Sequence, residues 1–278
     1  MPELPEVETI VRSLKAVLKS KQILKIIVYH SRPLGSLKPL VFKRLLQGKV
    51  FSEIKRRGKY ICFNFEDNSS LIVHLRMTGG FLYQKPNIPE GAKDHLRLAF
   101  FLSDGSSLLY QDSRLFGTFR YYPPQAAIAE FLVLGPEPFD KSLTPDAFHS
   151  ICKGRKLAIK DLLLDQKAIA GLGNIYACEA LFQTRLNPFR RASNLTQAEC
   201  QLLLTKIKEV LRLAIRFQGT SIRDYQNIDR QKGRFQNLLS VYGQASKPCP
   251  VCQRPIKRLV QKQRPTFFCP HCQKAPGP

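Results

Sequence analysis

The spacing of apolar residues changes near residue 135 of the chain. Before that point, short apolar runs rich in β-branched and aromatic residues alternate with turn-forming Asp, Asn and Gly. The runs are Ile23–Tyr29, Val50–Arg56, Tyr60–Phe65, Ser70–Leu75, Leu96–Leu102, Ser107–Tyr110 and Phe116–Tyr122. Many short strands at close spacing predict a β-sandwich or a barrel. One amphipathic helix precedes them, and we expect it over Thr9–Ser20 because Pro5 is excluded from a helix interior.

Beyond the segment Gly135-Pro136-Glu137-Pro138 the apolar period becomes that of helices. The first expected helix has Thr144 as its N-cap and ends at Cys152. Three more are expected over Lys160–Leu164, Ile175–Gln183 and Thr196–Gln218. A capping box formed by Thr196 and Glu199 marks the start of the last helix.

The stretch Gly171-Leu172-Gly173-Asn174 interrupts this helical pattern. In a helix–two-turn–helix arrangement, the break would leave backbone N–H groups at the start of the next helix available to an anion. The alternative is a glycine-rich C-cap with no ligand.

Four cysteines near the C-terminus have the spacing of a zinc site. Cys249 and Cys252 form one C-x₂-C pair, Cys269 and Cys272 form a second, and sixteen residues separate the pairs. Two such pairs close a tetrahedron around one structural Zn²⁺ and leave no position open for catalysis. Chance spacing or disulfides are the alternatives. The strands expected between the pairs, Ile256–Val260 and Thr266–Phe268, form a hairpin too small to fold without the metal.

These patterns together predict an α+β multidomain chain. We expect a β-sandwich with a leading helix over residues 1–135, a helix–two-turn–helix domain over 136–244, and a zinc-ribbon hairpin over 245–278.

The charge indicates a polyanionic partner. The chain of 278 residues has 44 Lys and Arg against 21 Asp and Glu, a net charge of +23. A surface needs no such excess for solubility, so nucleic acid is the first candidate and an anionic membrane surface the second. We find no apolar run long enough to span a bilayer and no signal peptide, and therefore expect a soluble cytoplasmic protein. No heptad pattern indicates assembly, so we expect a monomer.

The first residues offer a nucleophile. If Met1 is removed, Pro2 becomes a free secondary amine beside the carboxylate of Glu3. An α-amino group titrates near neutral pH, and a secondary amine that attacks a sugar C1′ gives a cationic iminium that favours elimination. The alternative is that Pro2 only protects the N-terminus and Glu3 only caps the following helix.

Several motifs in the same order resemble bacterial formamidopyrimidine-DNA glycosylases. They are Pro2-Glu3-Leu4-Pro5-Glu6-Val7-Glu8-Thr9, Arg57-Gly58-Lys59-Tyr60, His74-Leu75-Arg76-Met77-Thr78-Gly79, Asp94-His95, Asp112-Ser113-Arg114-Leu115-Phe116-Gly117, Asp165-Gln166, Gly171-Leu172-Gly173-Asn174-Ile175-Tyr176 and the end of the cysteine hairpin from Arg264 to Gln273. The related endonuclease VIII group usually has Gly where this chain has Leu4. Gln253 and Gln263 stand where the family commonly has glycine.

The resemblance implies a bifunctional base-excision repair enzyme. Such an enzyme removes 8-oxoguanine and formamidopyrimidines from duplex DNA and then cleaves the strand by β- and δ-elimination. By matching position, Pro2 is the implied Schiff-base nucleophile, Glu3 the proton donor, Lys59 the aid to β-elimination and Arg264 the aid to δ-elimination. The implied DNA contacts are Asn174 and Arg264 at phosphates, with His74, His95 and Arg155 as further ones. For Lys59 and His74, a solvated surface position is the alternative.

The resemblance also implies a wedge that fills the gap left by a flipped nucleotide. Met77, Arg114 and Phe116 match it: the thioether and the ring suit a base stack, and a guanidinium suits an unpaired cytosine. Met77 and Phe116 could instead belong to the core, but each lies next to a predicted turn. Two functional alternatives stay open, an oxidised-pyrimidine glycosylase like endonuclease VIII and a DNA-binding protein without catalysis.

Overall fold

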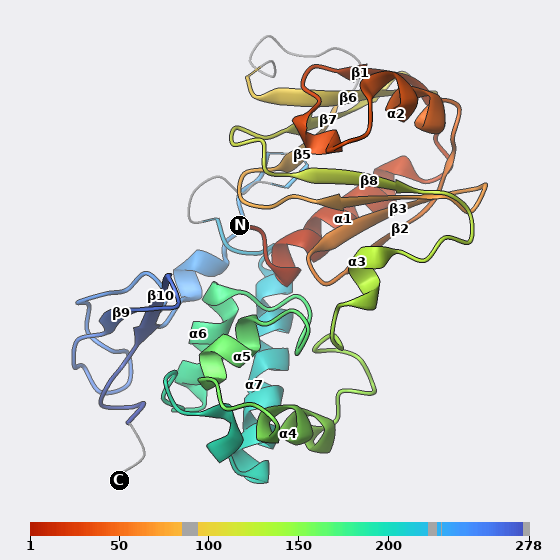
Figure 1. The fold of residues 1–278 in the computed structure, drawn as a ribbon. Coiled ribbons are helices and arrows are strands. Elements are labelled where there is room, and N and C mark those ends of the chain that lie inside the picture. Colours follow the sequence, from red (N-terminus) through yellow and green to blue (C-terminus); the bar gives the residue numbers. More distant parts are fainter. Residues whose placement is uncertain (85–93, 222–226, 229, 275–278) are drawn as a thin grey trace. The chain divides into compact units, whose positions relative to one another are not determined.

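The computed structural model describes residues 1–84, 94–221, 227–228 and 230–274 (Figure 1). The chain forms two compact units. The first contains Met1–Leu132 and Phe217–Arg234, and the second contains Val133–Arg216 and Phe235–Pro278.

Two four-stranded antiparallel sheets form the sandwich of the first unit (Figure 1). One sheet has the order β1-β6-β7-β5, and the other has the order β2-β3-β4-β8. The strands are β1 (Ile23–Val28), β2 (Phe51–Arg57), β3 (Tyr60–Phe65), β4 (Ser70–His74), β5 (Gly80–Gln84), β6 (Leu96–Leu102), β7 (Ser107–Gln111) and β8 (Thr118–Tyr122). The sandwich is therefore confirmed, while β5 was not predicted because Gly79 and Gly80 mark a turn.

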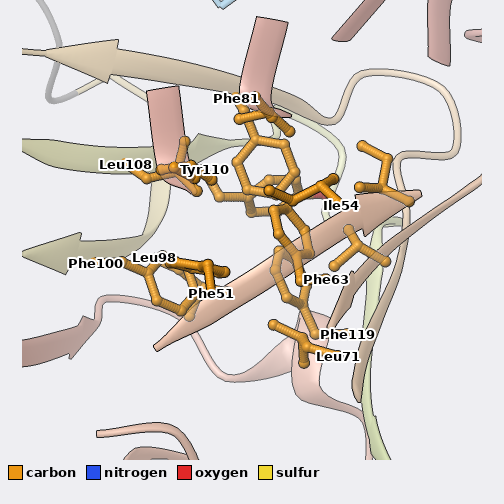
Figure 2. Packing of buried hydrophobic residues seen from close by; sticks show 14 of the residues in the cluster. Phe51, Ile54, Phe63, Leu71, Phe81, Leu98, Phe100, Leu108, Tyr110 and Phe119 are labelled. Carbon is orange, nitrogen blue, oxygen red and sulfur yellow. The ribbon is translucent and has the colours of Figure 1, made fainter. Parts of the chain in front are cut away.

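Aromatic residues from both sheets fill the core between them. Phe51 and Phe63 come from one sheet, and Phe81 and Phe100 come from the other (Figure 2). The rings of Phe63 and Phe81 meet edge to face, with centroids 5.6 Å apart. Such contacts add to the hydrophobic stabilisation that comes from removing the rings from water.

The leading helix α1 (Leu4–Leu18) begins five residues before the predicted start at Thr9. The prediction was wrong because Pro5 lies in the first turn, where its missing N–H has no intrahelical partner to lose. Val7, Ile10, Leu14 and Leu18 form its fully buried stripe. Two further helices of this unit, α2 (Pro39–Leu46) and α3 (Ala129–Leu132), are short and were not predicted.

The second unit is helical apart from one hairpin. Its helices are α4 (Pro145–Lys153), α5 (Ile159–Leu164), α6 (Asn174–Gln183) and α7 (Gln197–Arg216), and its hairpin pairs β9 (Lys257–Gln261) with β10 (Arg264–Phe268). Short 3₁₀ turns cover Arg32–Leu34 in the first unit and Ala192–Asn194 and Phe235–Leu238 in the second. No helix in the described residues is long and apolar enough to cross a membrane.

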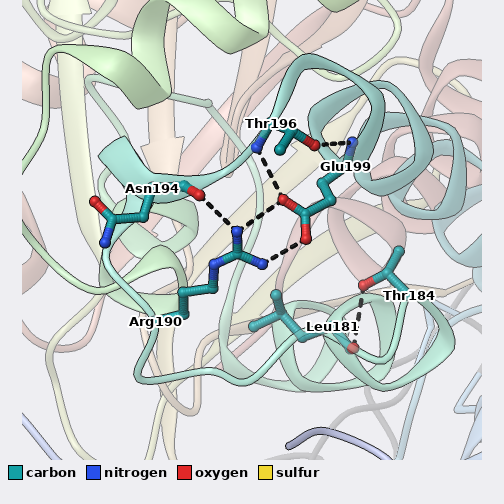
Figure 3. Close-up of polar contacts among 6 residues, drawn as sticks. All are labelled: Leu181, Thr184, Arg190, Asn194, Thr196 and Glu199. Atoms are coloured by element: carbon teal, nitrogen blue, oxygen red, sulfur yellow. Dashed lines mark hydrogen bonds and ion pairs between the residues drawn. The ribbon is translucent and has the colours of Figure 1, made fainter. Parts of the chain in front are cut away.

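Both predicted helix caps are present. The Thr144 side chain accepts a hydrogen bond from the Ala147 N–H at 3.2 Å. Thr196 and Glu199 exchange the two hydrogen bonds of a capping box, of 2.8 and 3.2 Å (Figure 3). Arg190 pairs with the same Glu199 carboxylate and also donates to the Asn194 carbonyl, which fixes the turn that enters α7 (Figure 3).

Candidate active site

Pro2 and Glu3 lie at the buried start of α1. Glu3 is the N-cap residue and is 4% exposed. Its backbone N–H donates to Glu6 Oε2 at 2.7 Å, and Glu6 Oε1 accepts from the Thr220 N–H at 2.8 Å. Glu6 thus ties the N-terminus to the segment that follows α7. A Cβ at Gly219, whose φ is +80°, would lie 2.7 Å from Glu6 Oε1, so only glycine fits this contact.

Lys59 lies in the two-residue turn between β2 and β3. Gly58 precedes it with φ of 56°, a left-handed conformation that glycine adopts without strain. Lys59 is 5% exposed, so the solvated-surface alternative is wrong for this residue.

His74 ends β4 and is 7% exposed, which also excludes the solvated-surface alternative for it. Its ring meets the Tyr60 ring edge to face at 4.7 Å, and its Nδ1 accepts the Arg76 N–H at 2.9 Å. Burial, with the nearby charges of Arg76 and Lys59, lowers the pKa of His74 to about 3. The neutral ring with Nδ1 as acceptor carries its proton on Nε2, which is therefore a hydrogen-bond donor.

This environment predicts that His74 stays neutral through the physiological range. In histidine-labelled protein, nitrogen NMR should show the Nε2–H tautomer of His74 from pH 8 down to pH 5. Because an unfolded histidine binds a proton below about pH 6.5 and folded His74 does not, the stability that this residue contributes falls as pH drops from about 6.5 towards 3. His74→Gln should show a shallower loss of stability in that window. Protonation of His74 near pH 6.5 would contradict this environment.

The three predicted wedge residues lie together on two neighbouring loops. Arg114 Nη1 is 3.1 Å from Met77 Sδ, and its guanidinium lies 5.0 Å from the centre of the Phe116 ring. Met77 is 45% exposed and Phe116 is 42% exposed, so the core alternative is wrong for both. Strand β8 begins at Thr118, two residues later than predicted, and this leaves Phe116 in the loop.

Asp112 holds these loops in place. It is 1% exposed, and its carboxylate accepts hydrogen bonds from the Gly117 N–H at 2.8 Å and the Arg114 N–H at 3.1 Å. Thr78, next to Met77, donates its hydroxyl to the same carboxylate. Gly117 is required here because a Cβ at this position would lie 1.7 Å from the Tyr110 hydroxyl oxygen.

Two further predicted DNA contacts are exposed. His95 has φ of 60° and comes directly before β6, and its carbonyl accepts the Asp112 N–H at 2.9 Å. Arg155 lies in the second unit, 3.8 Å from Asp165 Oδ2. Both side chains are therefore accessible to a polyanion.

In the second unit, α6 and the hairpin meet at the carbonyl of Pro265. Asn174 begins α6, and its Nδ2 donates to that carbonyl at 2.8 Å. The Asn174 Oδ1 has no hydrogen-bond partner within the described residues. Gly171 and Leu172 are held by the Gln166 side chain, and α5 ends earlier, with Asp165 as its C-cap. The glycine-rich stretch is therefore not a helix C-cap.

Arg264 follows a tight turn at the tip of the hairpin. Lys262 and Gln263 have φ of 44° and 63°, the pattern of a type I′ turn. Gln263 thus keeps the left-handed conformation that a glycine would adopt there. Directly after Arg264 in the chain, Pro265 and Thr266 are held by fully buried Lys160, which donates to Thr266 Oγ1 at 2.7 Å and to the Pro265 carbonyl at 3.3 Å. Arg264 itself is exposed.

The four C-terminal cysteines meet at one point. Their sulfur atoms all lie within 4.8 Å of one another, with Cys249 and Cys272 at 3.8 Å and Cys252 and Cys269 at 3.5 Å. A tetrahedron with Zn–S bonds of about 2.3 Å has edges of about 3.8 Å, so this set fits Zn²⁺. The N–H groups of Val251 and Cys272 point to cysteine sulfurs at 3.5 Å, as expected around thiolate ligands.

Sequence reasoning missed Glu6, Asp112 and Lys160 as functional supports. All three are buried charged residues that bond backbone or hydroxyl groups of segments distant in sequence. Pro2, Glu3, Lys59, His74 and the wedge lie in the first unit, while Asn174, Arg155, Arg264 and the cysteines lie in the second.

Comparison with known proteins gives consistent matches along the chain. Residues 1–119 match the formamidopyrimidine-DNA glycosylase N-terminal domain, residues 134–226 match the H2TH domain of the same enzyme, and residues 246–275 match the zinc finger found in FPG and IleRS. The finger therefore holds one structural Zn²⁺ through its four cysteines.

Full-length relatives and solved structures agree with these domains. The formamidopyrimidine-DNA glycosylase of Heliobacterium modesticaldum is 41% identical and that of Carboxydothermus hydrogenoformans 40%, each with 99% of this chain and 100% of the relative covered. A Lactococcus lactis FPG mutant in complex with Fapy-dG-containing DNA superposes with a TM-score of 0.92 at 34% identity, over 99% of this chain and 100% of that one. The FPG protein from Thermus thermophilus gives 0.88 at 37% identity, over 100% of both chains. The chain therefore belongs to the formamidopyrimidine-DNA glycosylases, the DNA glycosylases and AP lyases that remove oxidised purines in base-excision repair.

Proposed function

We propose that Pro2, once Met1 is removed, is the nucleophile of this enzyme. Its lone pair attacks C1′ of the damaged nucleotide, and the base leaves with the electron pair of its bond to C1′. The nitrogen of Pro2 then loses its proton, and the bond between C1′ and the ring oxygen opens to the iminium as Glu3 protonates that oxygen. The observation that carries this proposal is the burial of Pro2 and Glu3 at the start of α1, where Glu6 holds the Glu3 backbone. A buried carboxyl group in such a place suits proton transfer.

Strand cleavage follows from the iminium. Loss of a C2′ proton expels the 3′ phosphate, and a second elimination expels the 5′ phosphate. We propose that Lys59 assists the first elimination and that Arg264 assists the second. Lys59 lies in a tight hairpin turn and Arg264 directly follows one, and a cation beside a leaving phosphate stabilises the charge that develops there.

The damaged nucleotide must leave the duplex before it can react, at a cost of a few kcal/mol. We propose that Met77, Arg114 and Phe116 fill the space that this nucleotide leaves in the duplex. Arg114 then forms hydrogen bonds with the unpaired cytosine. Their mutual contacts and the exposure of Met77 and Phe116 support this role. Asn174 and Arg264 are the proposed contacts to the phosphates beside the lesion, and His74, His95 and Arg155 are further proposed contacts to the DNA.

Oxidised purines are the proposed substrates. Leu4 is fully buried in this chain, at the position where the endonuclease VIII group usually has Gly. The test is a panel of duplexes, each with one lesion, under single-turnover conditions. We expect excision of 8-oxoguanine and formamidopyrimidine opposite cytosine to be at least tenfold faster than excision of thymine glycol opposite adenine. The reverse order would overturn this substrate assignment.

Binding to damaged duplex DNA should depend strongly on salt. Lys59, Arg155 and Arg264 are three proposed cationic phosphate contacts, which predict a slope of about −2.7 in log affinity against log salt. Affinity should then fall about 40-fold between 50 and 200 mM salt. Fluorescence anisotropy measures this, and Arg264→Gln should reduce the slope by about 0.9. A flat salt response would show that these cations do not contact phosphates.

We further propose that residues 1–135, 136–244 and 245–278 act as catalytic, helix–two-turn–helix and zinc-finger domains, respectively. The enzyme is proposed to work as a monomer in the bacterial cytoplasm, where it has access to the nucleoid.

A further inference from the structure

Glu8 connects α1 to the end of β2 through an ion pair. Its Oε2 lies 2.8 Å from Arg56 Nε, while its Oε1 lies 2.8 Å from Arg12 Nε. The side chains of Glu8 and Arg56 are 19% and 10% exposed, whereas Arg12 is 65% exposed. The pair with Arg56 is therefore largely shielded from water and stronger than the pair with Arg12.

The carboxylate of Glu8 is ionised at neutral pH. Burial favours its protonated form, but hydrogen bonds and charge from Arg12 and Arg56 outweigh burial and lower its pKa. Arg56 thus has a fixed anionic partner on α1, the helix that directly follows Pro2 and Glu3.

The second edge of the Arg56 guanidinium reaches the turn that carries Lys59. Arg56 Nη1 donates to the carbonyl of Gly58 at 3.2 Å. That carbonyl belongs to the peptide bond between Gly58 and Lys59, so the hydrogen bond fixes the plane from which the Lys59 side chain departs.

We propose that Arg56, held by Glu8, is a positioning residue that orients Lys59 relative to the helix of Pro2. The proposal rests on the function assigned above to Lys59. Arg56 acts through the Gly58 peptide and has no contact with DNA in this role. An arginine is required because only its planar fork can bond a carboxylate with one edge and a carbonyl with the other.

The proposal predicts which step of the reaction slows when Arg56 is replaced. With abasic-site DNA and saturating enzyme, Arg56→Met should cleave the strand about tenfold more slowly, since small errors in position of a catalytic group cost one to two orders of magnitude. Its borohydride-trapped Schiff base should form at the wild-type rate, because Lys59 assists only the later step. Arg12→Gln removes the other partner of Glu8 and should cleave within twofold of wild type.

A double-mutant cycle separates positioning from general damage to the fold. Lys59→Met should slow cleavage about 100-fold, and Arg56→Met added to it should slow cleavage no further. If the two losses multiply, or if Arg56→Met slows trapping as much as cleavage, the proposal is wrong. If Lys59→Met cleaves normally, the role assigned to Lys59 fails as well; if only Arg56→Met is normal, this proposal alone fails.

A second variant covers the case in which Arg56→Met does not fold. Arg56→Lys keeps the buried cation beside Glu8 but cannot bond the Gly58 carbonyl at the same time. Circular dichroism should show it folded, with the same tenfold loss in cleavage and normal trapping. Wild-type cleavage by Arg56→Lys would overturn the requirement for the fork.

Discussion

Enzyme that retains Met1 should form no Schiff base with abasic-site DNA. With Met1 attached, the nitrogen of Pro2 is an amide nitrogen, whose lone pair is delocalised into the carbonyl. Trapping with borohydride should fall by at least ~10³-fold, the scale of loss when a covalent nucleophile is removed. Intact mass spectrometry distinguishes the trimmed and untrimmed forms, so both can be assayed from one preparation or from two expression hosts.

The control is a variant that keeps Pro2 as a free amine but replaces the neighbouring Glu3. Glu3→Gln should still give the trapped adduct with abasic DNA, whose sugar also exists as an open aldehyde and needs no proton on its ring oxygen, but should excise 8-oxoguanine far more slowly. Equal trapping by the Met1-retaining and trimmed forms would exclude Pro2 as the nucleophile.

Removal of zinc should have the second large effect. The hydrophobic cluster at the hairpin consists of Cys178, Phe182, Val241, Cys249, Ile256, Phe267 and Cys269, and two of these residues are metal ligands. Without the metal, nothing joins the two cysteine pairs, and the hairpin loses the tie that closes its two ends. The turn that carries Arg264 then has no fixed position, and affinity for abasic-site DNA should fall at least ~100-fold.

A cysteine variant provides a test that does not depend on a chelator. Cys269→Ala should bind no zinc and lose affinity to the same extent, whereas Cys62→Ala, which removes a buried thiol of β3, should retain one zinc per chain and normal affinity. Anisotropy gives the affinity and atomic absorption the metal content. Tight binding by metal-free protein would show that the finger does not hold Arg264 for DNA.

The parts of the fold that could be predicted depend on local patterns. Strands β3 and β6, the capping box at Thr196 and the zinc ligands follow from alternation, side-chain chemistry and spacing within a few residues. The start of α1 was predicted too late, because Pro5 interrupts a helix interior but is accepted in the first turn.

The supports of the site were not predictable because their partners are distant in sequence. Glu6 bonds a backbone group 214 residues away, and Lys160 bonds a hydroxyl 106 residues away. Single-sequence patterns give no signal for such pairs. The same reason explains why Lys59 and His74 were considered possible surface residues: they border a turn or a strand end, and packing in three dimensions buries them.

The central claim is that the amine of Pro2 attacks the sugar of an oxidised purine nucleotide. The most direct measurement is borohydride trapping with a duplex that contains 8-oxoguanine opposite cytosine, followed by digestion and mass spectrometry of the protein–DNA adduct. We expect a single adduct on the peptide that begins with Pro2. An adduct on a peptide that contains Lys59 or another lysine, with the Pro2 peptide unmodified, would contradict it.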